Sequence, residues 1–312
     1  MCILLFNKQR VFGKFMIQTK CGYVAIIGRP NVGKSTLLNN ILGEKLSITC
    51  RKPQTTRHQI MGIKTTEETQ FVYVDTPGVH TNSQNALNHY MNKAAESIID
   101  DVHVVLFLIE SNKWTDVEDK VFKRLSQLDI PVIVAINKAD MIKDKSIILP
   151  LIGKINQVSD KFITIPVSAK SGKNVPELEK IIEDCLPESE FYYDPELLTD
   201  RSENFLVSEI IREKLMRSLG DEIPYQLTVE INQFKYDEIK DITDISATIL
   251  VERNQQKAMV IGKGGSKLKE VGSAARTDIE KLVETKVYLQ LWVKVKEGWA
   301  DSEASIKSLG YF

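Results

Sequence analysis

The chain has 312 residues. Because a single hydrophobic core of ordinary size does not organise so many residues, two domains are expected. Hydrophobic residues make up 43% and charged residues 27%. This composition excludes wholesale disorder and favours a soluble globular protein. The formal net charge is -1, from 41 Lys and Arg against 42 Asp and Glu. That balance excludes a protein that coats nucleic acid over its whole surface, but it permits a local basic face.

The cysteines and the apolar segments exclude further classes. Four scattered cysteines (Cys2, Cys21, Cys50 and Cys185) lack metal-ligand spacing, so we expect free thiols in a reducing compartment. No segment approaches the roughly 20 apolar residues that cross a bilayer. In residues 1–15 the apolar positions precede the charges, the reverse of a secretory signal, which predicts a flexible extension or an unused upstream start. A membrane-surface anchor in this segment is the less favoured alternative.

The first half alternates short apolar runs with amphipathic stretches. Such alternation predicts a doubly wound α/β domain with a mainly parallel sheet, whose ligand lies at the carboxyl ends of the strands. The expected strands are residues 23–27, 70–74, 102–109, 131–136 and 162–166, and the expected helices are 35–42, 85–99, 116–128 and 175–185.

The second half has a different order and an uneven charge. Residues 188–244 contain 15 acids and 6 bases, whereas residues 253–297 contain 10 bases and 5 acids. Expected elements follow the order α-β-β-α-α-β, with a glycine-rich turn between the second and third helices, which indicates an α+β domain. The expected organisation is an extension (1–20), a first domain (21–186), a linker (187–203), a second domain (204–300) and a tail (301–312).

A phosphate-binding loop follows the first expected strand. Residues 28–35 read GRPNVGKS and match GxxxxGK[ST] between a strand and a helix. Backbone N–H groups of such a loop cradle phosphate oxygens, Lys34 reaches the β- and γ-phosphates, and the Ser35 hydroxyl binds Mg²⁺. The expected nucleotide-binding residues are Gly28, Arg29, Pro30, Asn31, Val32, Gly33, Lys34 and Ser35.

Two further segments are expected beside the phosphates. Asp75, Thr76, Pro77 and Gly78 follow a buried strand, so that Asp75 can hold magnesium through water and the Gly78 N–H can meet the γ-phosphate. Residues 54–58 (QTTRH) form a polar loop in which a threonine can complete the magnesium shell only when a γ-phosphate is present, as in a switch. Thr56 is favoured over Thr55, but spacing leaves both open.

Residues 137–140 (NKAD) predict guanine recognition. The Asp140 carboxylate offers two acceptors to the N1–H and 2-amino donors of guanine, a donor pair that adenine lacks. The stem of Lys138 can lie along the purine, and Asn137 can tie its loop to the phosphate loop. Ser168, Ala169 and Lys170 follow the next strand and can donate a backbone N–H to guanine O6.

The expected catalytic groups are Lys34, Thr56 and Gly78. Gly78 is followed by Val79, which cannot hold a nucleophilic water by a hydrogen bond. Hydrolysis is therefore expected to be slow, or to use a monovalent cation or a partner. For His58 a surface contact is favoured over a role as the base.

The second domain contains a GXXG loop. Glycines without side chains let a sugar–phosphate backbone approach the following helix, and nearby lysines neutralise phosphates. GXXG alone also fits a helix-capping turn, but the element order and local basic charge favour single-stranded RNA. Ile261 and the strand 243–253 are expected walls of the groove. The expected RNA-binding residues are Ile261, Gly262, Lys263, Gly264, Gly265, Lys267 and Lys269.

Together these motifs, with VIGKGGSKLK at 260–269, resemble the Era family of bacterial GTPases over residues 21–300. The resemblance implies a Ras-like G domain followed by a type II KH domain. It implies nucleotide contacts from residues 31–36, including Thr36, and from Asp75, Asn137, Asp140 and Ala169. It also implies a possible K⁺ at Asn31.

The resemblance further implies cofactors, partners and a location. The cofactors are GTP or GDP and Mg²⁺. The partners are the 3′ end of 16S rRNA and the 30S ribosomal subunit, with a role in 16S rRNA processing and 30S assembly. A monomeric cytoplasmic protein is expected, with peripheral association with the inner membrane. The alternative function is a nucleotide-stabilised RNA-binding or membrane-associated scaffold with incidental GTP turnover.

Overall fold

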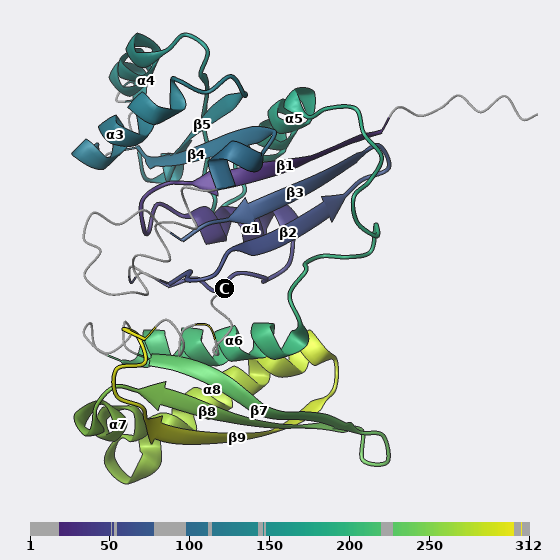
Figure 1. Cartoon of the computed structure of the whole chain (residues 1–312), viewed down its shortest axis with the longest axis vertical. Helices are drawn as coiled ribbons and strands as arrows, with labels where there is room; N and C mark the ends of the chain where they lie inside the picture. Colours follow the sequence, from purple (N-terminus) through teal and green to yellow (C-terminus); the bar gives the residue numbers. More distant parts are fainter. Residues whose placement is uncertain are drawn as a thin grey trace, which may run out of the picture.

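The computed structural model describes residues 19–50, 52, 55–77, 98–111, 114–142, 146, 148–219, 227–302 and 307. Within these ranges the chain forms two sheets with their helices, one above the other along the long axis of the molecule (Figure 1).

A six-stranded sheet organises the first half, in the order β2-β3-β1-β4-β5-β6. β2 is antiparallel to β3, and the other neighbours are parallel, which confirms the predicted α/β fold with a mainly parallel sheet. The strands are β1 (Lys20–Ile27), β2 (Ile60–Thr65), β3 (Thr69–Asp75), β4 (Val104–Glu110), β5 (Val132–Asn137) and β6 (Ile163–Pro166).

Helices cover both faces of this sheet, so the central strands are buried throughout. Alternate residues of β1 divide between two cores. Val24 and Ile26 pack with α1 (Lys34–Leu42) and α5 (Val175–Cys185). Ala25 and Ile27 share the second core with residues of α3 (Asp116–Leu125) and α4 (Ile148–Val158).

The sequence did not predict β2 or α4, and most of the helix expected at 85–99 lies outside the described residues. Ile98 and Ile99 belong to a short 3₁₀ turn, η1 (Ile98–Asp101). The linker lies along the first domain, where the Ile63 amide donates to the Leu198 carbonyl at 2.8 Å. No helix in the described ranges is long and apolar enough to span a bilayer.

The second half has the predicted α-β-β-α-α-β order. β8 lies between antiparallel β7 and parallel β9, and α6 and α8 pack on one face of this sheet. α6 lies on the side that faces the first domain (Figure 1). The elements are α6 (Glu203–Ser218), β7 (Leu227–Asp237), β8 (Ile242–Val251), α7 (Asn254–Ile261), α8 (Ser266–Val283) and β9 (Lys286–Val295).

Candidate functional site: a phosphate loop with a magnesium site, and a GXXG loop

The phosphate loop occupies the turn from β1 to α1. Gly28 and Gly33 have positive φ angles of 149° and 106°. A Cβ atom on Gly28 would lie 2.4 Å from the Leu108 carbonyl oxygen, and one on Gly33 would lie 2.3 Å from Asn137 Nδ2. Both positions therefore require glycine for space as well as for conformation.

Lys34 points back into this loop. Its side chain is buried, and Nζ donates to the carbonyl oxygens of Gly28 (3.0 Å) and Arg29 (3.1 Å). Burial lowers the pKa of Lys34 to about 8, although the nearby Asp75 carboxylate opposes the shift. A buried ammonium within a cradle of backbone groups is suited to a polyanion.

Three oxygen-bearing side chains meet beside Lys34. Ser35 Oγ donates to Asp75 Oδ2 at 2.7 Å and lies 2.8 Å from Thr56 Oγ1. Asp75 is fully buried, and its Oδ1 has no hydrogen-bond partner in the described part of the chain. Burial raises the pKa of Asp75, against the opposing effects of Lys34 and Ser35. Two hydroxyls and a partly unpaired carboxylate are hard oxygen ligands, so this donor set fits Mg²⁺.

The hydroxyls of Thr55 and Thr56, between which spacing alone could not choose, lie in different places. The Thr56 hydroxyl lies within hydrogen-bonding distance of Ser35 Oγ, whereas the Thr55 hydroxyl donates to the Lys52 carbonyl at 2.6 Å. Of the two hydroxyls, that of Thr56 is the one that lies beside Ser35 and faces the Asp75 carboxylate site.

The base-binding segments join the phosphate loop through Asn137. Its Nδ2 donates to the Val32 carbonyl at 2.7 Å, and its Oδ1 accepts from the Ala169 amide at 2.9 Å. The Ala169 amide already donates to Asn137, so a hydrogen bond from it to guanine O6 would share this N–H group. The neighbouring Lys170 amide is the alternative donor to guanine O6. Asp140 is exposed in the turn Ala139–Met141, which directly follows β5 and Lys138.

Several expected contact residues have other structural roles. Arg29 forms an ion pair with buried Glu118, which also closes the capping box of α3. The Thr76 hydroxyl donates to the Ile26 carbonyl at 3.0 Å and so links β3 to β1. Lys138 Nζ pairs with Glu110 Oε1 at 2.8 Å.

Other expected residues are placed only by their elements. Pro30 and Asn31 lie in the phosphate loop, where Asn31 is exposed at φ 63°, and Thr36 lies in the first turn of α1. Ser168 begins the turn after β6, and its Oγ accepts from the Ser171 amide at 3.2 Å. Pro77 is buried, while Gln54, Gly78, Val79 and His80 lie outside the described residues.

The expectation of a surface contact for His58 was wrong. Its side chain is buried and meets the Phe205 ring of α6 edge-on, with 5.0 Å between ring centroids. Burial lowers the pKa of His58 to about 4, so the ring is neutral at physiological pH. Sequence reasoning also missed Arg57 and Arg212, which join this segment to α6 and β7 across the domain boundary.

The GXXG loop is an exposed turn between α7 and α8. Gly262, Gly264 and Gly265 have positive φ angles of 73°, 59° and 76°. A Cβ atom on Gly262 would lie 2.7 Å from Lys267 Cβ. Ile261, at the end of α7, packs against the core of the domain.

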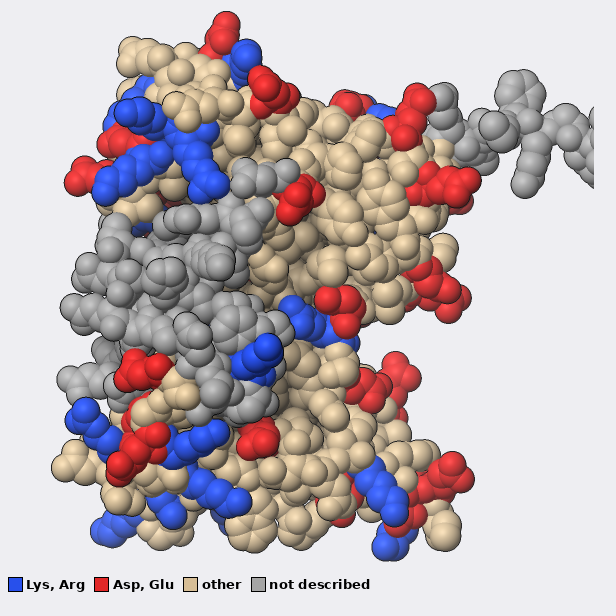
Figure 2. Space-filling model, in the orientation of Figure 1, with Lys and Arg blue, Asp and Glu red and all other residues tan. Residues whose placement is uncertain are grey.

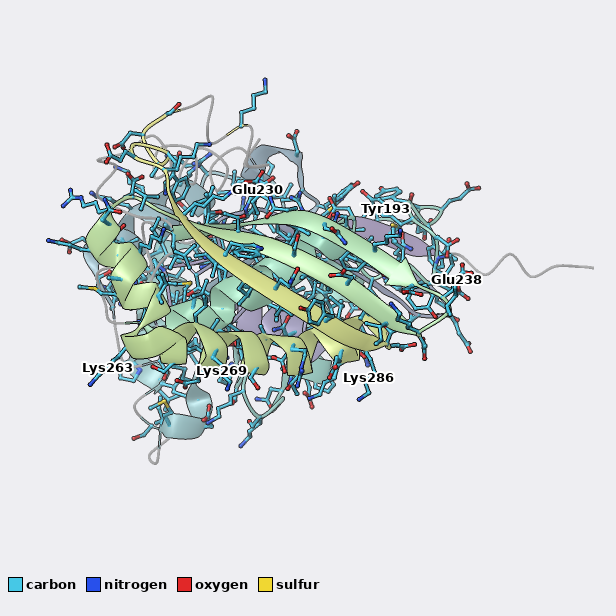
Figure 3. All side chains as sticks on the ribbon, turned by 90° about the horizontal axis from the view of Figure 1, so that it is seen from below. Tyr193, Glu230, Glu238, Lys263, Lys269 and Lys286 are labelled. Carbon is cyan, nitrogen blue, oxygen red and sulfur yellow. The ribbon has the colours of Figure 1, made fainter. Side chains whose placement is uncertain are left out.

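Basic side chains surround this loop. Lys263 and Lys269 are exposed and project outward from the α8 side of the domain (Figure 3). Figure 2 shows Lys and Arg side chains over α7 at the lower left, with acidic side chains among them. The strand expected as a groove wall, residues 243–253, is mostly the central strand β8. β9, one of the two edge strands of the sheet, packs against both α7 and α8, and β8 also contacts α7.

Known proteins match both domains. The family model described as "50S ribosome-binding GTPase" matches residues 23–138, and a KH domain model matches residues 222–300. The chain is 53% identical to GTPase Era of Glaesserella parasuis over 294 residues, covering 94% of this chain and 98% of the relative. It is 51% identical to GTPase Era of Ectopseudomonas mendocina over 293 residues, covering 94% of this chain and 97% of the relative.

Two solved structures have the same fold at TM-score 0.90 and 38% identity, each covering 94% of this chain and 99% of the solved chain. One is a single-residue variant of Aquifex aeolicus Era bound to GDP·AlF4⁻. The other is Era in complex with MgGDPNP and nucleotides 1506–1542 of 16S ribosomal RNA. These matches confirm the predicted family: the chain belongs to the Era family of GTPases.

Proposed function

We propose that this GTPase binds and hydrolyses GTP in residues 21–186 and binds the 3′ end of 16S rRNA through residues 204–300. Residues 187–203 join the two domains. The proposed role is in 16S rRNA processing and assembly of the 30S subunit. The observation that carries the proposal is the convergence of Lys34, Ser35, Thr56 and Asp75 at one buried point, in a chain that also carries a GXXG loop. Relatives crystallised with GDP·AlF4⁻, and with MgGDPNP and 16S rRNA nucleotides, support it.

Each group at this point has a role in binding the triphosphate. Lys34 exchanges its two carbonyl contacts for β- and γ-phosphate oxygens. Ser35 and Thr56 would hold Mg²⁺ with their hydroxyls, and Asp75 would do so through a water. When bound, the cation neutralises charge that develops on the phosphate oxygens. Gly78 is proposed to meet the γ-phosphate, and the lack of a water-orienting side chain at Val79 makes turnover slow.

At the other end of the site, Asp140 selects guanine. Its exposed carboxylate accepts from N1–H and the 2-amino group. Adenine has no such donor pair and would leave the carboxylate unmatched. Asn137 keeps this segment and the phosphate loop at a fixed separation, because it bonds to Val32 on one side and Ala169 on the other.

We also propose K⁺ as a second cation near Asn31. The support is the exposed position of Asn31 in the phosphate loop and the valine at position 79. A K⁺ ion there would add positive charge beside the phosphates during hydrolysis, a stabilisation that neither Asn31 nor Val79 supplies through its own side chain. Hydrolysis should be faster in potassium than in sodium buffer, and equal rates would remove this role.

The proposed location and assembly follow from the RNA partner and the family resemblance. We place the protein in the cytoplasm as a monomer, with peripheral association with the inner membrane. Fractionation of cells into soluble and membrane material tests the location directly.

The GTPase proposal and the scaffold alternative differ in the effect of nucleotide on RNA binding. We expect the affinity for an RNA of the 16S 3′ end to differ at least about fivefold between the GTP-analogue and GDP states, since linked sites in one protein typically couple by this much. Fluorescence anisotropy with GTP analogue, GDP and no nucleotide measures it. Equal affinity in all three states would support the scaffold.

Nucleotide binding should take up protons. With a pKa of about 8, half of Lys34 is neutral at pH 8 in the nucleotide-free protein, and phosphate contact raises this pKa. We expect uptake of about 0.5 proton at pH 8 and about 0.1 at pH 7, and weaker binding as pH rises above 8. Calorimetry of GDP binding in two buffers of different ionisation enthalpy measures the uptake. No uptake at pH 8 would show that Lys34 is already charged.

Gly264→Asp tests the RNA site. Gly264 has φ 59° and open space around it, and aspartate tolerates this conformation, so the domain should still fold. The new carboxylate would face RNA phosphates, and we expect affinity to fall about tenfold. Gly43→Asp is the matched control, because Gly43 has φ 74° and open space in the first domain. Unchanged affinity with an unchanged salt dependence would refute the GXXG assignment.

A further inference from the structure

The segment 55–58 lies between the two domains and is buried along its whole length. Thr55, Thr56, Arg57 and His58 are each at most 9% exposed. A polar segment is buried in this way only if other groups satisfy its hydrogen bonds. Several of those groups belong to the KH domain.

Arg212 of α6 contacts this segment directly. Its Nη2 donates to the Thr55 carbonyl, although the two residues are 157 positions apart. The guanidinium is 1% exposed and is held from the other side by Glu209, with Nε to Oε1 at 2.7 Å and Nη2 to Oε2 at 2.6 Å. This bidentate ion pair fixes the orientation of the Arg212 guanidinium.

Arg57 makes the reverse contact, from the first domain to the second. Its Nη1 donates to the Leu227 carbonyl at the start of β7 at 2.7 Å, and its guanidinium lies 6.0 Å from the Trp299 ring centroid. The residues on both sides of Thr56 are therefore bonded to the KH domain, one through its carbonyl and one through its side chain.

Thr56 itself faces the other way, into the magnesium site, where its Oγ1 is 2.8 Å from Ser35 Oγ. We propose that Arg212 is a positioning residue of the GTPase reaction: through the Thr55 carbonyl, the KH domain holds the Thr56 hydroxyl at the magnesium and γ-phosphate site. This inference rests on the proposed role of Thr56. In this role Arg212 acts through the segment 55–58 and not through a contact with the nucleotide.

The competing explanation is that Arg212 only fastens the domains together. Arg217 provides the comparison, because it lies on the same helix and also crosses the boundary, donating to the Thr49 carbonyl at 2.9 Å. Its bonds within the described chain go to Thr49 and Glu213 rather than to residues 55–58, and its side chain is 50% exposed. Arg212→Ala and Arg217→Ala thus each remove one interdomain contact, but only the first acts on the segment that carries Thr56.

The test uses the full-length protein and three measurements. These are single-turnover GTP hydrolysis with Mg²⁺, GDP affinity, and hydrogen exchange of the amides of residues 55–60 with a bound GTP analogue. For Arg212→Ala we expect hydrolysis about tenfold slower and faster exchange in this segment, with GDP affinity within about twofold of wild type. GDP lacks the γ-phosphate that Thr56 serves, so its affinity reports an intact first domain.

Arg217→Ala should match wild type in all three measurements. Arg212→Lys keeps the charge but not the planar fork, so its rate should fall between those of Arg212→Ala and wild type. Arg57→Met removes the Leu227 contact and should also slow hydrolysis and speed exchange, which gives a second route if Arg212→Ala folds poorly.

Two results would overturn the inference. One is an Arg212→Ala protein that matches Arg217→Ala in hydrolysis and exchange. The other is loss of GDP affinity in both Arg212→Ala and Arg57→Met, which would show a structural role alone. A wild-type protein whose GTP-analogue affinity does not depend on Mg²⁺ would instead refute the proposed magnesium site. Because it is measured on the wild-type protein, that result is distinguishable from the two results with the variants.

Discussion

The proposed nucleotide site of the first domain is built around one buried carboxylate. Asp75 is fully buried and has one oxygen without a hydrogen-bond partner among the described residues. An ionised carboxylate in such a place is costly unless it is paired or bound to a cation. Ser35, Thr56 and Lys34 surround it, from the phosphate loop and the segment 55–58. Mg²⁺ bound together with the phosphates would supply the missing positive charge and would tie these segments together.

The fold brings these groups to one edge of a sheet. β1, β3 and β5 are parallel, so the phosphate loop, Asp75 and Asn137 all follow or lie at the carboxyl ends of buried strands. The second domain extends this arrangement, because Arg212 bonds to the residue before Thr56. The nucleotide site and the KH domain are thus in contact through the described segment 55–58, which gives a physical route by which each can affect the other.

Local patterns predicted much of this structure. The phosphate loop, most central strands and the element order of the second domain follow from residues close together in sequence. β2 was not predicted, because Gly62 and Lys64 interrupt its apolar pattern and it forms only by pairing with β3. β7 continues to Asp237 through mostly exposed residues, because β8 pairs with it there.

The contacts across the domain boundary could not be predicted from the residues that neighbour them in the sequence. Arg57 and His58 are polar residues in a polar loop, and only the three-dimensional structure shows that α6, β7 and Trp299 cover them. Thr55 and Thr56 are adjacent and chemically identical, so the choice between them depends on backbone direction alone. Which strands lie beside the GXXG loop also depends on packing: the expected wall, residues 243–253, is mostly the central strand β8, and the edge strand β9 packs against both α7 and α8.

The most direct test of this account is the affinity of the wild-type protein for a non-hydrolysable GTP analogue, measured with Mg²⁺ and again after chelation. The account predicts that chelation weakens binding by tenfold or more, since about 1.4 kcal/mol of cation-mediated contact is a factor of ten. The same affinity with and without Mg²⁺ would contradict the view that Ser35, Thr56 and Asp75 form a magnesium site.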